Sequence, residues 1–208
     1  MPDVAITGIE EVGEQTVAIE LETPNDFEAS PGQFILVRAT IGGEDEKGYY
    51  TISSPDVAGT FEITVAVTPD GTLGPWLADR SVGDEITVEG PYGTVRYTGA
   101  DDAIVIAGGP GIGPAVGIGE RAISSDHDVT ILYGGDQPPH ARRLDELERN
   151  GATVVTAENL EKATRDIDFS DGTVFVFGFE NFVERVETEL SEIGVDSDDV
   201  EIENFGPE

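Results

Sequence analysis

The residues best placed to do chemistry are the glycines and prolines of Gly108–Pro114. The apolar run Ile104–Ala107 before them is typical of a strand buried on both faces, and Ala115–Ile123 after them is typical of a helix. Glycines at such a junction let the backbone turn tightly and approach a ligand, and Pro114 suits a first helical turn. The free N–H groups at the start of the helix then favour an anion such as a pyrophosphate. The spacing is not that of the GxGxxG fingerprint, so these residues alone also allow a turn that binds nothing.

The composition excludes several classes of function. The chain of 208 residues has 43 acidic residues against 11 basic ones, a formal net charge of −32, which disfavours nucleic acid and anionic membranes as partners. Because the acids are interspersed with apolar segments, we interpret them as the solvated coat of a folded protein from a saline cytoplasm. The absence of cysteine excludes disulfides, thiolate nucleophiles and cysteine-ligated iron–sulfur clusters.

The two histidines and the N-terminus give further expectations. His127 and His140 each lie in a polar stretch, so we expect both at the surface, and no spacing of residues predicts a metal site. Met1-Pro2-Asp3 lacks the features of a secretory signal, and no apolar run approaches the ~20 residues of a membrane-spanning helix. We therefore expect a cytoplasmic protein without membrane insertion.

The first half of the chain predicts an antiparallel β-barrel of six strands, which we place at residues 1–99. Clusters of turn residues separate short segments that are apolar or alternate between apolar and polar residues. The clearest of these segments are Thr16–Glu22, Phe34–Ala39, Phe61–Val67 and Ile86–Glu89. One brief helix is expected at Pro75–Asp79.

The second half, residues 100–208, predicts an α/β domain with a parallel sheet. Strand-like and helical segments alternate there, which favours a sheet covered on both faces. The predicted strands are Ile104–Ala107, Val129–Tyr133, Thr153–Val155 and Val174–Phe177, and the predicted helices are Ala115–Ile123, Arg142–Asn150 and Asn181–Glu192.

Six motifs, in order along the chain, resemble those of the ferredoxin–NADP reductase superfamily. They are Pro31–Phe34 (PGQF), Tyr50–Ser54 (R-x-Y-S/T-x-x-S), Gly71–Leu77 with Gly83-Asp84 and Gly90–Gly93, Gly108–Pro114 (GGxGIxP), Tyr133-Gly134 (YG) and Glu203–Phe205 (E-x-F). The resemblance implies an FAD-binding barrel followed by an NAD(P)-binding domain, and transfer of electrons between a nicotinamide and the flavin.

The resemblance also implies roles for individual residues. Tyr50 would lie against the isoalloxazine ring, and Thr51 would offer a donor to flavin N5. Phe205 would cover the flavin until the nicotinamide displaces it, while Glu203 would assist electrostatically or only cap the last strand. Further FAD contacts would come from Tyr49, Ile52, Ser53, Ser54, Val67, Gly71, Thr72, Leu73 and Gly74. The nicotinamide cofactor would contact Gly108, Gly109, Pro110, Gly111, Ile112, Gly113, Tyr133, Asp136, Gly178 and Phe179.

Some positions depart from the motifs of this superfamily. Gly48 replaces the arginine that holds the FAD pyrophosphate, where Lys47 could substitute, and Gly74 replaces a Ser or Thr. Losing one charged hydrogen bond typically costs ~1.5–3 kcal/mol, so the resemblance implies weaker FAD binding. Phe177-Gly178-Phe179 keeps only the glycine of the C-G-P motif, and the short span Gly151–Gly172 predicts a reduced helix.

The choice of nicotinamide depends on residues after the second strand of the α/β domain. Asp136 suits the free 2′-hydroxyl of NADH and repels the 2′-phosphate of NADPH. Arg142 and Arg143 argue the other way unless they pair with Asp145 and Glu146 at the start of a helix, which we expect. The sequence therefore favours NADH slightly.

Two classes of function remain open from the sequence. The first is an FAD-dependent NAD(P)H oxidoreductase, similar in length and layout to dihydroorotate dehydrogenase electron-transfer subunits but without their cysteines. Its electrons would pass to an external acceptor, such as a ferredoxin or a partner dehydrogenase subunit. The second is a non-catalytic electron-transfer or regulatory subunit whose flavin site has decayed, as Gly48 and Gly74 suggest.

Overall fold

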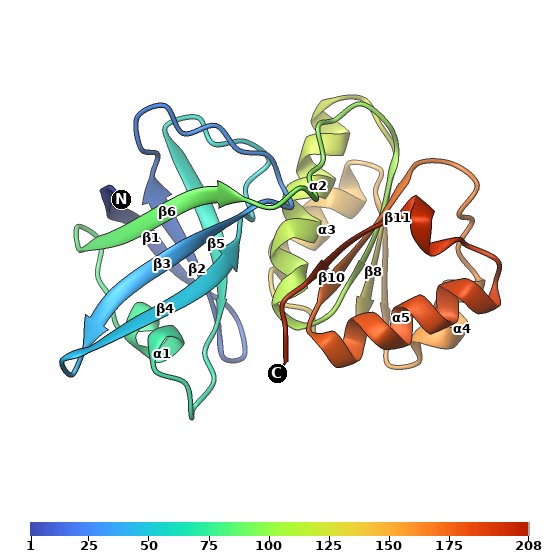
Figure 1. Cartoon of the computed structure of the whole chain (residues 1–208). Helices are drawn as coiled ribbons and strands as arrows, with labels where there is room; N and C mark the ends of the chain where they lie inside the picture. The colour runs from blue at the N-terminus through green and yellow to red at the C-terminus, as the bar shows by residue number, and fades with distance from the viewer. Residues whose placement is uncertain (208) are drawn as a thin grey trace.

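The chain folds into an antiparallel sheet and a parallel sheet that lie side by side (Figure 1). The computed structural model describes residues 1–207. No helix among these residues is both long and apolar enough to cross a membrane.

The antiparallel sheet has six strands in the order β4-β3-β6-β1-β2-β5. It curls so that its end strands meet beside Ile52, which bridges to Ile63 of β5. One short helix, α1 (Leu73–Ala78), packs against it close to the predicted position. The strands are β1 (Asp3–Gly13), β2 (Thr16–Glu22), β3 (Phe34–Ile41), β4 (Glu44–Thr51), β5 (Thr60–Ala66) and β6 (Glu85–Tyr92).

The barrel core comes from the alternating apolar residues of these strands. Ile19, Leu21, Ile35, Val37 and Ile63 are fully buried in it. Burying each such side chain contributes about 1.5–3 kcal/mol, so the alternation fixes which face of every strand points inward. The barrel thereby holds the end of β4, with the flavin motif, in one place.

The parallel sheet has five strands in the order β11-β10-β7-β8-β9. The strands are β7 (Ala103–Ala107), β8 (Val129–Gly134), β9 (Thr153–Ala157), β10 (Thr173–Gly178) and β11 (Val200–Asn204). The helices are α2 (Ile112–Ser124), α3 (Ala141–Arg149), α4 (Leu160–Arg165) and α5 (Glu180–Glu192), with 3-10 turns η1 (Gly109–Gly111) and η2 (Ser197–Asp199). The predicted fold class, a six-stranded antiparallel barrel followed by an α/β parallel sheet, is confirmed.

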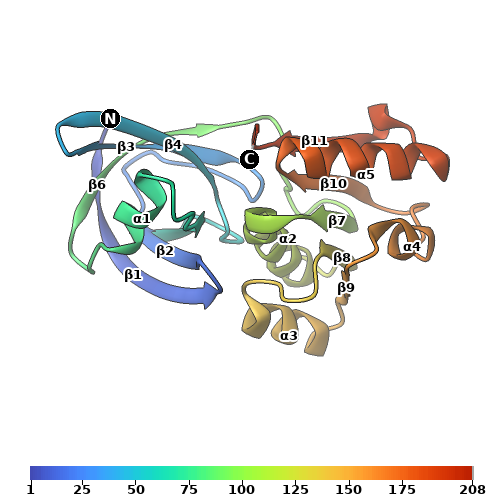
Figure 2. The same ribbon diagram turned by 90° about the horizontal axis from the view of Figure 1, so that it is seen from below.

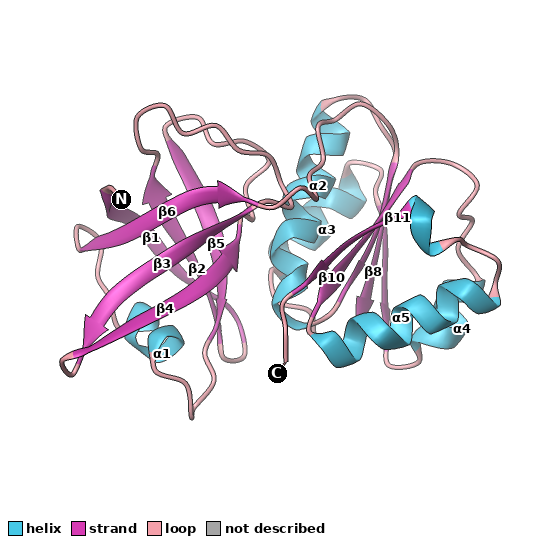
Figure 3. Ribbon diagram, viewed as in Figure 1, coloured by secondary structure: helices cyan, strands magenta, loops and turns pink. Residues whose placement is uncertain are grey.

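Helices cover both faces of the parallel sheet (Figures 2 and 3). Helices α2 and α3 lie on the face toward the barrel, and α4 and α5 lie on the far face. Each face has its own core, centred on α2 in the first case and on α5 in the second. The six-residue α4 is the reduced helix expected between Gly151 and Gly172.

Candidate functional site

A groove of about 1110 Å³ opens where β7, β8 and β10 end. The strands on either side of β7 are β8 and β10, so the groove lies where the strand order reverses, which is where α/β sheets bind ligands. Its walls come from both domains: Gly108, Gly109, Pro110, Tyr133, Gly134, Asp136 and Phe179 from the α/β domain, and Val12–Thr16 and Ala66–Thr68 from the barrel.

The glycines of the turn at this groove are required for two different reasons. A Cβ on Gly108 would lie 2.5 Å from the Phe182 ring, and one on Gly111 would overlap the carbonyl oxygen of Phe177. These two glycines are therefore required by packing against α5 and β10. Gly109 has a φ of +54°, and a Cβ there would meet nothing within 4 Å. Gly109 is thus the glycine that leaves open space in the groove for a ligand.

Only part of the predicted nucleotide-binding stretch reaches the groove. Gly108, Gly109 and Pro110 line it. Ile112 is fully buried in the core, and a Cβ on Gly113 would lie 2.5 Å from Thr64 Oγ1 of the barrel. Gly111, which we predict to contact the nicotinamide cofactor, packs instead against the main chain of β10, which occupies the space beside its Cα.

The wall of the groove includes three further predicted residues. Tyr133, Asp136 and Phe179 line it, with Asp136 exposed. Burial, and to a lesser degree the charge of Asp136, raises the pKa of the Tyr133 hydroxyl, which therefore remains a neutral donor. Gly178 lies behind this wall, because a Cβ there would be 2.5 Å from the Phe182 ring.

A second cavity, of about 500 Å³, brings the three predicted catalytic residues together. It is lined by Thr51, Glu203 and Phe205, with the aromatic rings of Phe34, Tyr49 and Tyr92 around them. Burial raises the pKa of the Glu203 carboxyl. Tyr49 is 64% exposed and makes an edge contact with Phe34 at 5.5 Å between ring centroids.

One aromatic pair joins this cavity to the groove. Phe179 lines the groove, Phe205 lines the second cavity, and their rings meet edge to face at 5.9 Å between centroids. The nucleotide groove and the surroundings of Thr51 are therefore neighbours, separated by two side chains.

Tyr50 and Thr51 leave β4 from opposite faces, as successive residues of a strand do. Tyr50 packs against the barrel core with Leu73, and burial raises the pKa of its hydroxyl. Strand β4 is at the end of the sheet order, so its outer edge has no hydrogen-bonded strand before the bridge between Ile52 and Ile63. A flat ring can contact both side chains only if it lies along this free edge.

The positions expected to hold a pyrophosphate are filled by the protein itself. A Cβ on Gly48 would lie 3.0 Å from the Leu73 side chain and 3.1 Å from the Tyr50 hydroxyl. A Cβ on Gly74 would lie 2.7 Å from the carbonyl oxygen of Ala66. Lys47 is on the face of β4 opposite to Gly48, so strand geometry gives no support to the alternative that it substitutes for the missing arginine.

The rest of the flavin motif points into the protein. Ile52 is fully buried in the barrel core. The Ser53 hydroxyl is 2.7 Å from Thr64 Oγ1, and the Ser54 hydroxyl accepts a hydrogen bond from the Glu62 N–H at 2.6 Å. Of the remaining predicted FAD contacts, Val67 lines the groove, Leu73 is buried, and Gly71 and Thr72 are exposed in front of α1.

Two expectations about polar residues are also wrong. His140 is only 3% exposed, because the loop before α3 packs against the barrel. Arg143 pairs with Glu62 and Glu120, and Arg142 with Glu10, in place of Asp145 and Glu146. These partners are far away in the sequence, and spacing along one helix gives no signal for them.

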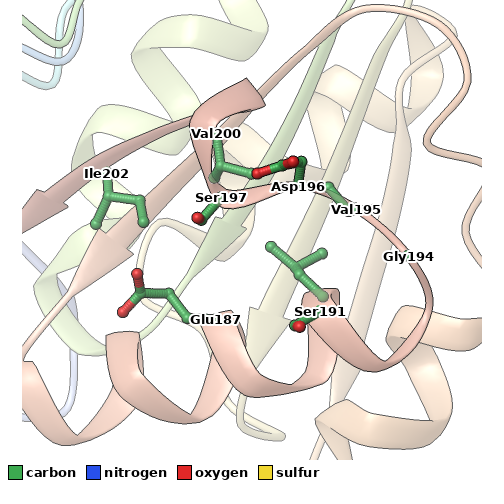
Figure 4. Close-up of a pocket in the computed structure, with 9 residues that line it drawn as sticks. Glu187, Ser191, Gly194, Val195, Asp196, Ser197, Val200 and Ile202 are labelled. Carbon is green, nitrogen blue, oxygen red and sulfur yellow. The ribbon is translucent and has the colours of Figure 1, made fainter.

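Another hollow, of about 320 Å³, lies between α5 and β11 (Figure 4). It is lined by Glu187 and Ser191 of α5, the segment 194–197, and Val200 and Ile202. None of its lining residues belongs to the groove or to the cavity at Thr51. It is therefore separate from the candidate site.

Comparison with known proteins shows which families and proteins this chain resembles. Residues 3–97 match the family described as oxidoreductase FAD-binding domain. A Methanopyrus kandleri protein, named as a probable dihydroorotate dehydrogenase B (NAD(+)) electron transfer subunit, is 34% identical to this chain. The alignment covers 70% of this chain and 54% of that protein. It is 33% identical to NADH-cytochrome b5 reductase 1 of Emericella nidulans, over 64% of this chain and 47% of the reductase.

A solved structure has the same fold along nearly the whole chain. The FAD/NAD-binding domain of a nitric oxide dioxygenase from Vibrio cholerae matches with a TM-score of 0.83 at 19% identity, covering 99% of this chain and 98% of that domain. This chain therefore has the two-domain fold of that FAD/NAD-binding domain, and its residues 3–97 match the oxidoreductase FAD-binding domain family. The match over the barrel is to an FAD-binding domain, and the names of two relatives include NAD(+) or NADH. The chain spans about half the length, or less, of the curated relatives that it matches.

The chain's own residues fit these cofactors unequally. The groove with its open Gly109 fits a dinucleotide, and the free edge of β4 with Thr51 fits a flavin ring. Beside Gly48 the nearest side-chain donor is the Tyr50 hydroxyl, and beside Gly74 the nearest group is the carbonyl oxygen of Ala66. FAD thus fits this site through its ring and through backbone contacts.

Proposed function

We propose that the chain is a flavin-dependent NAD(P)H oxidoreductase that accepts a hydride from a nicotinamide in the groove and delivers electrons to an external acceptor. The observation that carries this proposal is the contact between Phe179 and Phe205, because it makes the groove and the cavity of Thr51 neighbours. Hydride transfer needs its two reactants in contact, and this is where residues of both cofactor sites converge.

FAD, when bound, supplies the ability to take two electrons from a nicotinamide and release them to an acceptor. The turn at Gly108–Pro110, which lines the groove, would receive the dinucleotide phosphates along its backbone. The Thr51 hydroxyl, which lines the cavity, would offer a hydrogen-bond donor at flavin N5. Phe205 excludes water from the flavin and moves aside when the nicotinamide enters, since it stands between the groove and Thr51.

We propose NADH as the preferred nicotinamide. Asp136 lies in the wall of the groove, where its charge repels a 2′-phosphate and its oxygens accept from a free 2′-hydroxyl. Arg143 cannot supply a counter-charge for that phosphate, because its guanidinium already contacts two carboxylates.

We further propose that the acceptor is a partner subunit in the cytoplasm. The chain has no cysteine to hold an iron–sulfur cluster. Several relatives are named as subunits: the Methanopyrus protein is an electron transfer subunit, and a 36% identical protein of Chromohalobacter salexigens is a glycine betaine monooxygenase reductase subunit.

A second candidate function rests on the filled positions at Gly48 and Gly74. A chain that binds FAD without side-chain contacts to the pyrophosphate can persist as a non-catalytic electron-transfer or regulatory subunit. Titration of the purified protein with FAD in high salt separates the two, because only the enzyme needs a tightly held flavin.

The test of the proposed function is a pair of substitutions at Thr51. Thr51→Val removes the hydroxyl with little change of shape, and we expect flavin reduction by NADH to slow about tenfold through loss of one hydrogen bond. Thr51→Ser keeps the hydroxyl and should stay within about threefold of wild type, a difference below 0.7 kcal/mol. The rates of flavin reduction are measured by stopped-flow absorbance. Equal rates in all three proteins would show that the Thr51 hydroxyl has no role in flavin reduction.

A further inference from the structure

Helix α2 lies directly against the barrel because two of its residues have no side chain. Gly113 and Gly117 are one turn apart on the same face of the helix. A Cβ on Gly113 would be 2.5 Å from Thr64 Oγ1, and one on Gly117 would be 2.8 Å from the carbonyl oxygen of Ser53. The helix that starts at the nucleotide turn is thus seated on the strand end that carries the flavin motif.

Arg143 of α3 fixes this contact from the side. Its side chain is only 15% exposed. Nε and Nη2 donate to the two carboxylate oxygens of Glu120 on α2 at 2.7 and 2.8 Å, a bidentate pair. Nη1 donates to Glu62 of β5 at 2.7 Å, and Nη2 also donates to the carbonyl oxygen of Ser53 at 2.7 Å.

The charges in this cluster depend on the arginine. Burial raises the pKa of the Glu62 carboxyl, and the charge of Arg143 opposes that rise. Without Arg143, the carboxylates of Glu62 and Glu120 would face each other half-buried and uncompensated. Arg143 is therefore what makes the approach of the two domains favourable at this point.

His140 closes the other side of the contact. Its Nε2 is 2.8 Å from Thr64 Oγ1, which is 2.7 Å from the Ser53 hydroxyl. The His140 N–H donates to the carbonyl oxygen of Val12 in β1 at 2.8 Å. The residue thereby ties the loop before α3 to three strands or strand ends of the barrel.

We propose that Arg143, assisted by His140, is a positioning residue for hydride transfer: it holds the nucleotide turn and the flavin edge at a fixed separation. We call the contact formed by Ser53, Thr64, Gly113, Gly117, His140 and Arg143 the domain seam. This inference rests on the proposed function. Ser53 follows Thr51 at the end of β4, and α2 begins where the turn at Gly109 ends, so any slip at the seam changes the distance between the two cofactor sites.

The test compares two neighbouring arginines in the FAD-loaded protein. Arg143→Met removes the guanidinium group and its hydrogen bonds, while Arg142→Met removes an arginine that is 72% exposed and pairs with Glu10 at 3.5 Å. We expect Arg143→Met to slow flavin reduction at saturating NADH by about tenfold or more, since small displacements cost up to ~100-fold. The Kd for NADH and for FAD should change less than about threefold. Arg142→Met should match wild type, and Arg143→Lys should recover part of the lost rate because it keeps the charge.

A wild-type rate of flavin reduction in Arg143→Met would overturn the proposal. So would equal losses of rate and of cofactor affinity, which indicate general damage to the fold. If Arg143→Met does not fold, Gly117→Ala tests the seam at a second point, because its methyl group would lie 2.8 Å from the Ser53 carbonyl oxygen while the arginine is kept.

Calorimetry of the protein without FAD tests the seam independently of catalysis. We expect wild type and Arg142→Met to unfold in one transition, and Arg143→Met in two, because the domains no longer stabilise each other. If wild type binds no FAD, the proposed function fails while this measurement still decides whether the seam couples the domains. A single unfolding transition in Arg143→Met would contradict the proposal that the domain seam couples the two domains.

Discussion

At the scale of single residues, the glycine turn combines a structural and a ligand-binding requirement. Gly111 is glycine because the main chain of β10 lies against it, whereas Gly109 faces an open groove with a φ of +54°. The sequence predicts the turn but cannot separate these reasons, because the difference depends on β10, whose residues follow much later in the chain.

Substitutions at Gly109 use this difference. Asn and Asp both tolerate the left-handed region, so Gly109→Asn and Gly109→Asp place side chains of similar shape in the groove. We expect the aspartate to bind NADH about tenfold more weakly than the asparagine, ~1.4 kcal/mol, through repulsion of the pyrophosphate. The measurement is the Kd for NADH by titration. Equal affinities of the two variants would show that the phosphates lie elsewhere.

At the scale of elements, the sequence pattern predicts those strands and helices whose formation depends on their own residues. Strands β2 and β7 and helix α5 follow from alternation, a continuous apolar run and helical periodicity. Strand β4 (EDEKGYYT) was not located as a strand, because its acids and its glycine hide the alternation and its pairing with β3 defines it.

The domain seam could not be predicted from local pattern. Arg143 reaches Ser53 across 90 positions, and His140 reaches Thr64 across 76. A polar residue next to polar neighbours is exposed by default, and only a second domain in contact reverses that. The motifs include Thr51, Glu203 and Phe205, which line one cavity, and Gly108 and Gly109, which line the groove, but they do not predict what holds these two places together.

The seam gives the protein a specific pH dependence. Burial, and then the charge of Arg143, lowers the pKa of His140 from 6.5 to about 3 in the folded state. The unfolded chain therefore binds the proton more tightly, so the stability from neutral His140 is complete above pH 6.5 and is lost as the pH falls toward 3. Between pH 7 and pH 5 the loss should reach about 2 kcal/mol.

The matched variant for this measurement is His140→Gln, which stays neutral. We expect its free energy of unfolding, from urea denaturation at constant salt, to fall less than that of wild type over this pH range. Parallel curves for the two proteins would mean that His140 is not buried as a neutral group.

At the scale of the whole molecule, the charge of −32 should make stability depend on salt. The Debye length falls from ~10 Å at 0.1 M to ~3 Å at 1 M, so salt screens the repulsion between exposed acids. The ion pairs of Arg143 are half-buried and should be screened less. We expect the Tm to rise steadily with KCl concentration, and a flat Tm would contradict adaptation to a saline cytoplasm.

In the whole molecule, we propose, the two domains bring a nicotinamide and a flavin together. The most direct measurement is anaerobic mixing of the FAD-loaded protein with NADH in high salt, followed through the visible absorbance of the flavin. We predict that the absorbance is bleached with one NADH consumed per FAD, and that NADPH bleaches it more slowly. A protein that holds FAD but keeps its oxidised spectrum with both nicotinamides would contradict the account.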